Sequence, residues 1–83
     1  MVNIYLTPKA QKDLKRIPKR KIIKIKRALG LLEKNPLAGK KLSDKLNNLL
    51  SLRAWPYRII YFIENKDVWV VNIRHRKDVY KRI

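Results

Sequence analysis

The last stretch of the sequence, residues 73–83, brings together side-chain types that can bind a phosphate group and move a proton. It reads IRHRKDVYKRI and includes His75, Arg76 and Tyr80. An arginine side chain is planar and always charged, and it can hold a phosphate through two parallel hydrogen bonds. A histidine titrates near neutral pH, and neighbouring cations lower the pKa of a phenol. The stretch is therefore either a phosphate site or a solvated basic surface whose histidine and tyrosine pack or stack.

A further arginine, Arg58, lies within the apolar run YRIIYFI at residues 57–63, which has the composition of a strand. Its neighbours on the same face of that strand are Ile60 and Phe62. A charge that is buried without a partner is costly. Arg58 therefore forms a salt bridge, reaches water at the end of the strand, or holds a phosphate with its guanidinium group.

The apolar runs 57–63 and 68–74 are separated by the turn-forming residues ENKD and are predicted to form an antiparallel hairpin. In a simple pairing, the start of the first strand faces the end of the second. Arg58 then lies opposite the region of Arg74, at the end of the sheet that leads into Arg76. These guanidinium groups either form one site or belong to a uniformly basic surface.

The charge of the chain indicates a negatively charged partner. Twenty-two lysines and arginines stand against six aspartates and glutamates, which gives a formal net charge of +16. Such an excess repels itself unless a polyanion offsets it. Nucleic acid or an acidic protein is the expected partner. An anionic membrane surface is a third kind of polyanion, but no membrane partner is expected, and no run reaches the roughly 20 apolar residues that cross a bilayer.

The composition excludes several kinds of metal and cofactor chemistry. The chain has no cysteine and a single histidine, and its six acids are scattered without the spacing of a two-metal site. It also lacks the glycine spacing of a phosphate-binding loop and of a dinucleotide-binding fingerprint. Any catalysis is therefore predicted to need neither a metal ion nor a small-molecule cofactor.

Cleavage by arginines and a phenol suits RNA better than DNA. RNA carries its own nucleophile, the 2′-hydroxyl, beside each phosphate. An enzyme then needs to orient that hydroxyl, help to remove its proton and stabilise the charge that grows on the phosphate. The sequence therefore favours RNA as the substrate of any catalysis.

The elements that must position these residues follow from the apolar pattern. Residues 2–6 read as a strand, and Thr7 is expected to cap a helix that has Pro8 in its first turn. Pro18 separates this helix from a second amphipathic helix. The second helix stops at KNP, residues 34–36, because the residue before a proline is pushed out of the helical conformation.

The remainder of the chain is predicted to form most of the sheet. Residues 37–49 are expected to be a loop leading into a strand, and three strands follow at 49–54, 57–63 and 68–74. The predicted fold class is α+β, with an N-terminal strand, a helical hairpin, a three-stranded antiparallel meander and a short C-terminal tail.

The chain as a whole is short. Residues 1–83 are expected to form a single domain. The beginning of the sequence lacks the features of a secretory signal, so the cytoplasm is the expected location.

The predicted order of elements, with YRIIY in the sheet and RHRKDVY after the last strand, resembles the RelE/ParE superfamily of type II toxins. The resemblance covers nearly the whole chain, and residues 57–80 are its specific part. The closing arginine and tyrosine resemble the RelE branch, whose members are mRNA endonucleases that act on the ribosome. The resemblance implies a RelE-like fold of the microbial-ribonuclease type and metal-independent cleavage of mRNA in the ribosomal decoding site.

Roles for individual residues are implied by the same resemblance. Arg58 matches the arginine of the family's "YR" strand and Arg76 matches the arginine after the last strand, both of which stabilise the scissile phosphate. Tyr80 matches a C-terminal tyrosine that stacks on a base or acts as general base. The 2′-hydroxyl attacks and leaves a 2′,3′-cyclic phosphate. The side chains expected to contact RNA are Arg53, Arg74, His75, Lys77 and Lys81.

The chain departs from the family pattern in one place. The best-studied bacterial form has two lysines on the strand before the "YR" strand, and Leu49 and Ser51 occupy those positions here. Arg53 is the remaining cation of that run. If a lysine is the base in that relative, Tyr80, His75 or another group takes its place in this chain.

The resemblance also implies partners and leaves alternatives open. The expected partners are an acidic, RelB-like antitoxin, together with mRNA and the ribosome. One alternative is a ParE-type toxin that shares the fold and inhibits DNA gyrase through a protein contact. Another is a basic module that binds RNA or the ribosome without catalysis.

Overall fold

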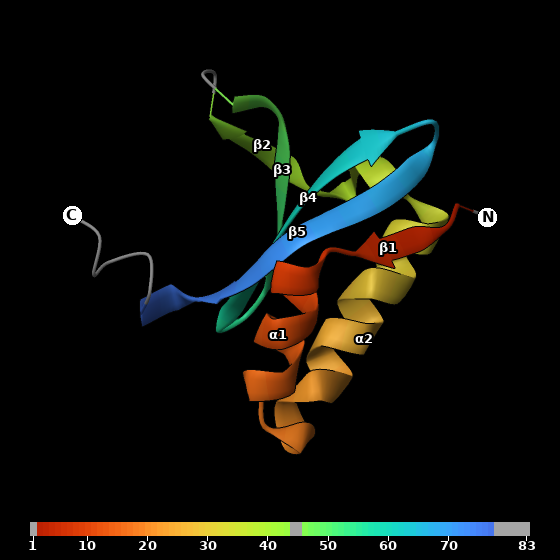
Figure 1. Ribbon diagram of the computed structural model, residues 1–83. Coiled ribbons are helices and arrows are strands. Elements are labelled where there is room, and N and C mark those ends of the chain that lie inside the picture. The colour runs from red at the N-terminus through yellow and green to blue at the C-terminus, as the bar shows by residue number, and fades with distance from the viewer. Residues whose placement is uncertain (1, 44–45, 78–83) are drawn as a thin grey trace.

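Two helices cover one face of a twisted five-stranded sheet (Figure 1), and the computed structural model describes residues 2–43 and 46–77. The strands run in the order β1-β5-β4-β3-β2, with β1 parallel to β5 and every other pair antiparallel. The strands are β1 (Ile4–Leu6), β2 (Lys40–Ser43), β3 (Leu46–Ala54), β4 (Tyr57–Glu64) and β5 (Asp67–His75). The helices are α1 (Pro8–Arg16), α2 (Lys19–Lys34) and the short 3-10 helix η1 (Pro36–Ala38). The predicted α+β class, with a strand and a helical hairpin before the meander, is confirmed.

The predicted loop at residues 37–49 is wrong in part. It contains η1, the strand β2 and the first residues of β3, so the meander has four strands instead of three. Lys40 and Lys41 disfavour a strand in the sequence, but β2 is an edge strand that pairs only with β3. Charged residues are common on edge strands because they discourage pairing with other chains.

The helix boundaries agree with the signals in the sequence. Thr7 caps α1, since its side-chain oxygen accepts a hydrogen bond from the backbone N–H of Ala10 at 3.2 Å, and Pro8 occupies the first turn. The chain leaves the helical conformation at Ile17, before Pro18. The helical hairpin is thereby fixed by residues that lie next to each other in the sequence.

The core lies between the helices and the face of the sheet that they cover. Ile25 and Leu32 of α2 are fully buried, and their spacing of seven residues places them on one side of the helix. Four side chains of the sheet are also fully buried, namely Ile59, Tyr61, Val68 and Val70. Side chains on the other face of the central strands point away from the helices.

One irregularity interrupts the ladder between β4 and β5. Ile60 pairs with Asn72, and the next residue of β4, Tyr61, pairs with Val70. Val71 is therefore an extra residue on β5, which makes this a β-bulge.

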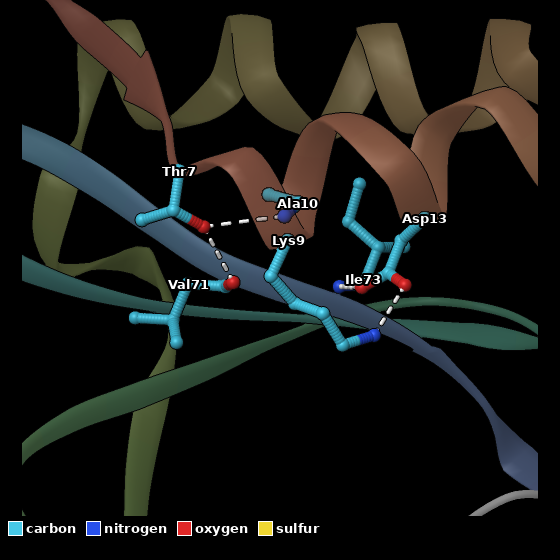
Figure 2. Close-up of polar contacts among 6 residues, drawn as sticks. All are labelled: Thr7, Lys9, Ala10, Asp13, Val71 and Ile73. Carbon is cyan, nitrogen blue, oxygen red and sulfur yellow. Dashed lines mark hydrogen bonds and ion pairs between the residues drawn. The ribbon is translucent and has the colours of Figure 1, made fainter.

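The first turns of α1 supply hydrogen bonds to the backbone at the bulge (Figure 2). Thr7 Oγ1 donates to the carbonyl of Val71 at 2.7 Å, and the N–H of Ile73 donates to Asp13 Oδ2 at 3.0 Å. Lys9 Nζ lies 2.6 Å from the other oxygen of Asp13. The buried carboxylate of Asp13 is thereby shared between a backbone donor and a cation.

The bulge decides which side chains of β5 face outward. Val70 and Ile73 are both buried under the helices although they are three residues apart, which a regular strand does not allow. Arg74 follows Ile73 and so points to the face that the helices leave uncovered. In a regular strand of the same sequence, Arg74 would share the covered face with Val70.

Candidate functional site

Three arginines lie side by side on the uncovered face of the sheet. Arg58 of β4 pairs directly with Arg53 of β3 on one side and with Arg74 of β5 on the other. Directly opposed side chains have Cβ atoms roughly 4.5–5.5 Å apart, and like charges in that position are destabilising. We call these three residues the arginine row. Its cost to the sheet is understandable if an anion binds there.

No carboxylate offsets the arginine row within the part of the chain that the structure describes. The ion pair that the described residues do form joins Lys9 and Asp13 on α1, on the other side of the sheet from the arginine row. Arg58 and Arg74 are half-buried and Arg53 is exposed. Of the three explanations left open for Arg58, a salt bridge therefore receives no support from the described residues, whereas contact with water at the end of the strand and a bound phosphate both remain.

Trp55 links the row to Arg76. Its ring centroid lies 5.7 Å from Cζ of Arg53 and 5.2 Å from Cζ of Arg76, within the range of cation–π contacts. The backbone N–H of Arg76 also donates to the carbonyl of Pro56 at 2.8 Å. The turn between β3 and β4 thus holds the segment after β5 close to the row. Trp55 lies between the strands predicted at 49–54 and 57–63 and was assigned no role from the sequence, although an aromatic residue between cations is a usable signal.

A hollow of about 450 Å³ adjoins the row on the side of β2. Arg53 and Arg58 line one side of it, and Lys40 and Lys41 line the other. Lys40 lies directly opposite Ser51 on the neighbouring strand, so a lysine stands beside a position where the family pattern has one and this chain does not. Sequence reasoning missed Lys40 and Lys41 because their segment was expected to be a loop.

His75 is separated from the row. It pairs with the buried Tyr57, and the two rings meet edge to face with centroids 5.1 Å apart. Its Nδ1 accepts a hydrogen bond from the N–H of Lys77 at 3.1 Å. Consecutive residues of a strand point to opposite faces, so His75 and Arg74 lie on different sides of the sheet.

Three further residues were expected at the site, and the structure describes one of them. Lys77 is exposed and follows Arg76 beyond the end of β5. Tyr80 and Lys81 lie outside the described residues. The described residues contain no group of three or more His, Cys, Asp or Glu side chains that could hold a metal ion. In the same part of the chain, no helix is long and apolar enough to cross a membrane.

Charge is segregated along the sheet. Glu64 and Asp67 pair at the turn that joins β4 to β5, six residues along β4 from Arg58. At about 3.3 Å a residue, this separates the acids from the arginine row by roughly 20 Å. The uncovered face therefore has a cationic end, where the arginines gather, and an end that carries acids.

Tyr61 holds the segment that brings Lys40 to the hollow. Its buried hydroxyl donates to the carbonyl of Pro36 at 2.7 Å and accepts from the N–H of Gly39 at 2.9 Å. A Cβ at Gly39 would lie 2.6 Å from that hydroxyl oxygen, so only glycine fits there. Burial raises the pKa of Tyr61 above its ordinary 10.0, and the hydrogen bond from Gly39 offsets part of the rise.

Replacing Tyr61 with phenylalanine is expected to lower the free energy of unfolding by about 1–2 kcal/mol, because two backbone groups lose a buried partner. Urea denaturation followed by circular dichroism measures this difference. The unfolded state loses the phenolic proton near pH 10 while the folded state keeps it, so the stability of the unaltered chain falls as the pH rises above that value. The difference between the two proteins is therefore expected to be constant below pH 10 and to shrink above it. A difference that grows at high pH would contradict this role.

The fold is that of RelE-like toxins. A chain of the toxin–antitoxin complex RelBE2 from Mycobacterium tuberculosis superposes with a TM-score of 0.80 and 30% sequence identity, covering 90% of this chain and 98% of that one. A chain of the intact RelBE toxin–antitoxin complex from E. coli superposes with a TM-score of 0.76 at 17% identity, covering 90% and 96%, which supports the fold alone.

The family follows from the sequence as a whole. Residues 4–80 match the family described as "ParE toxin of type II toxin-antitoxin system, parDE", and the chain belongs to that family. It is 35% identical over 83 residues to Toxin RelG of Mycobacterium tuberculosis, with 95% of each chain covered. The chain is thus a toxin of a type II toxin–antitoxin system, and the predicted membership of the RelE/ParE superfamily is confirmed.

Proposed function

We propose that this toxin is a metal-independent endoribonuclease that acts in the cytoplasm and cleaves mRNA in the ribosomal decoding site. The arginine row is the observation that carries the proposal. Three arginines occupy directly paired positions on an uncovered face, and Arg76 is held close to them through Trp55. An in-line attack by a 2′-hydroxyl places growing negative charge on one phosphate, and preorganised cations stabilise that charge.

The roles of the arginines follow from their positions. Arg58 is the central member of the row, so a phosphate bound over it lies within reach of both neighbours. Arg76 approaches from the segment after β5 and is proposed to contact the same phosphate. The hollow beside the row, lined by Lys40 and Lys41, suits the next phosphate along an RNA strand. These groups bind and stabilise charge, because an arginine does not give up its proton at neutral pH.

The proton of the 2′-hydroxyl needs a separate acceptor. We assign it to Tyr80, which the family resemblance matches to a general base and which lies outside the described residues. His75 is a weaker choice, since its ring packs against Tyr57 on the helix-covered face of the sheet. The 2′ oxygen bonds to phosphorus as the bond from phosphorus to the 5′ oxygen breaks, and the leaving oxygen takes up a proton, which gives a 2′,3′-cyclic phosphate and a 5′-hydroxyl.

The proposed partner is an acidic antitoxin of the RelB kind. Several of the similar chains of known structure come from complexes named for a RelB or a YefM partner. The net charge of +16 favours an acidic chain that neutralises the toxin as it binds. Such a partner also adds stability to a small folded chain by mass action.

Purified ribosomes programmed with a defined mRNA test the proposal. The unaltered toxin is expected to cut the mRNA in the decoding site, and Arg76→Ala is expected to cut about 10²-fold more slowly, as for the loss of one charge-stabilising group. The matched control is Lys34→Ala, which removes a cation at the end of α2. If the mRNA stays intact with the unaltered toxin as well as with Arg76→Ala, the proposal is contradicted.

A second function is open because the family is described by its ParE members. A ParE-type toxin would leave mRNA intact and inhibit the supercoiling activity of DNA gyrase. A gyrase supercoiling assay run beside the ribosome assay separates the two. The arginine row favours the ribonuclease, since a protein contact does not require guanidinium groups opposed on three adjacent strands.

A further inference from the structure

The strands β3 and β4 separate at one end of the sheet. Their register runs from Ala54 opposite Tyr57 to Leu50 opposite Tyr61, and the described residues of the two strands form no further pair. β4 continues to Glu64, whereas the earlier part of β3 pairs with β2. The two strands diverge there (Figure 1), so the backbone donors and acceptors on their facing sides do not satisfy each other.

A hollow of about 360 Å³ occupies the space between the separated strands. Asn48 and Leu49 of β3 line one side of it, and Phe62, Ile63 and Glu64 of β4 line the other. Phe62 and Glu64 lie four and six residues along β4 from the central member of the arginine row. Alternation along the strand therefore puts them on the same face of the sheet as that row. The hollow opens on the face where the RNA is proposed to bind.

Phe62 ends a stack of aromatic rings. Its ring centroid lies 6.3 Å from that of Trp69 with an angle of 7° between the planes, and Trp69 stacks in turn on Tyr5 at 4.6 Å. The register places the three residues side by side on β4, β5 and β1. The hollow is on the other side of Phe62 from Trp69, because β3 and β5 flank β4 on opposite sides. A flat ring bound in the hollow would extend this stack.

The polar groups of the hollow suit a nucleobase. Glu64 is exposed and its carboxylate only accepts hydrogen bonds, whereas the amide of Asn48 both donates and accepts. Guanine presents two adjacent N–H donors on its Watson–Crick edge, which match the two oxygens of a carboxylate. The other three bases present one donor there beside an acceptor, which a carboxylate disfavours.

We propose that this hollow binds a guanine base of the RNA strand whose phosphate lies over the arginine row. The inference rests on the proposed function and adds a base-selective site to it. Phe62 would stack on the base, and Glu64 would accept from its N1–H and its 2-amino group. The four residues from Arg58 to Phe62 span roughly 13 Å. Since a nucleic acid strand advances about 3.4 Å per nucleotide in a duplex and more when extended, the base lies within about four nucleotides of the bound phosphate.

Other occupants fit the hollow less well. An added peptide strand needs a longer edge, because residues 62–64 are the open part of β4 and a usual strand has about five or six residues. A cationic peptide could pair with Glu64, but the net charge of +16 repels it. A phosphate group is repelled by the carboxylate itself.

Oligonucleotides that cannot be cleaved test the site by binding alone. The probe is 2′-O-methyl octauridine with guanosine at positions 3 and 6, added to the full-length, ¹⁵N-labelled toxin. Its matched control carries inosine at the same positions, which lacks only the 2-amino group of guanine. Both are expected to shift the amide signals of the arginine row, and the guanosine probe is expected to shift those of residues 48–49 and 62–64 more strongly. It is also expected to bind about tenfold more tightly, as for one good two-pronged base contact.

Glu64→Gln and Asp67→Asn separate the contact from the charge. Both remove one negative charge at the same turn, but Asp67 does not line the hollow. Glu64→Gln is expected to reduce the preference for guanosine over inosine to about threefold or less, because an amide has one acceptor oxygen in place of two. Asp67→Asn is expected to keep the preference. Both variants are expected to bind plain octauridine at least as tightly as the unaltered chain, since a charge that repels phosphates is gone.

Four outcomes would overturn the inference. They are equal binding of the guanosine and inosine probes, an equal loss of preference in Glu64→Gln and Asp67→Asn, no signal change at residues 48–49 and 62–64, and binding of guanosine monophosphate as tight as that of the probe, which would make a free nucleotide the ligand. Folding of each variant is checked by its amide spectrum before titration. Because the assay involves no cleavage, its failure leaves the proposed ribonuclease standing, and a toxin that cuts no mRNA can still show the preference for guanosine.

Discussion

Arg58→Ala is expected to slow mRNA cleavage on programmed ribosomes by about 100-fold or more, while the chain stays folded. Arg58 is the central member of the arginine row, between Arg53 and Arg74. Its removal therefore leaves the phosphate without the cation directly beneath it. Single-turnover cleavage with ribosomes in excess measures the chemical step. Arg58→Lys is expected to recover part of the rate, because lysine keeps the charge and loses the two-pronged hydrogen bonding.

The fold must be tested separately in this variant. Removing one of three adjacent like charges relieves repulsion across the strands, so Arg58→Ala is expected to unfold at the same or a higher urea concentration than the unaltered chain. Lys34→Ala is the control for the loss of one positive charge outside the row. Normal cleavage by Arg58→Ala would mean that the row is not the site.

Asp13→Ala is expected to lower the free energy of unfolding by about 1.5–3 kcal/mol, the range for a hydrogen bond to a charged group. The substitution leaves the N–H of Ile73 without its acceptor beside the bulge in β5. Urea denaturation measures the change. Asp13→Asn is expected to lose less, because an amide oxygen can still accept that hydrogen bond.

Lys9→Ala separates the two contacts of Asp13. It removes the ion pair and leaves the hydrogen bond to Ile73 in place. Since the side chain of Lys9 is 65% exposed, the expected loss is at most about 1 kcal/mol. If Asp13→Ala costs no more than Lys9→Ala, the carboxylate does not stabilise the backbone at the bulge.

That Arg58 lies opposite the region of Arg74 could be predicted from the sequence. Two apolar runs flank a short turn, and the register of such a hairpin is set by the turn itself. Counting outward from Glu64 and Asp67, which pair at the turn, places Arg58 opposite Ile73, next to Arg74, and the extra residue of β5 moves the pairing to Arg74 itself. Local rules also determined the helical hairpin, because the cap and the prolines act on neighbouring residues.

Other features depend on contacts between distant parts of the chain. Lys40 and Lys41 form a strand only because β3 offers them a partner, which no local pattern reveals. The bulge depends on Thr7 and Asp13, more than 55 residues earlier in the chain. Grouping His75 with its arginine neighbours followed their closeness in sequence, whereas the alternation of a strand puts them on opposite faces.

The bulge in β5 also determines where this strand can lose one residue. If Val71 were deleted, regular alternation would keep Val70 and Ile73 inward and Arg74 outward, so every side chain downstream would retain its orientation. Deleting Trp69 instead would turn the side chains on one side of the deletion to the opposite face of the sheet. Gaps of one residue in an alignment of related toxins are therefore harmless at position 71, and homologues are best matched by counting back from the arginine after it.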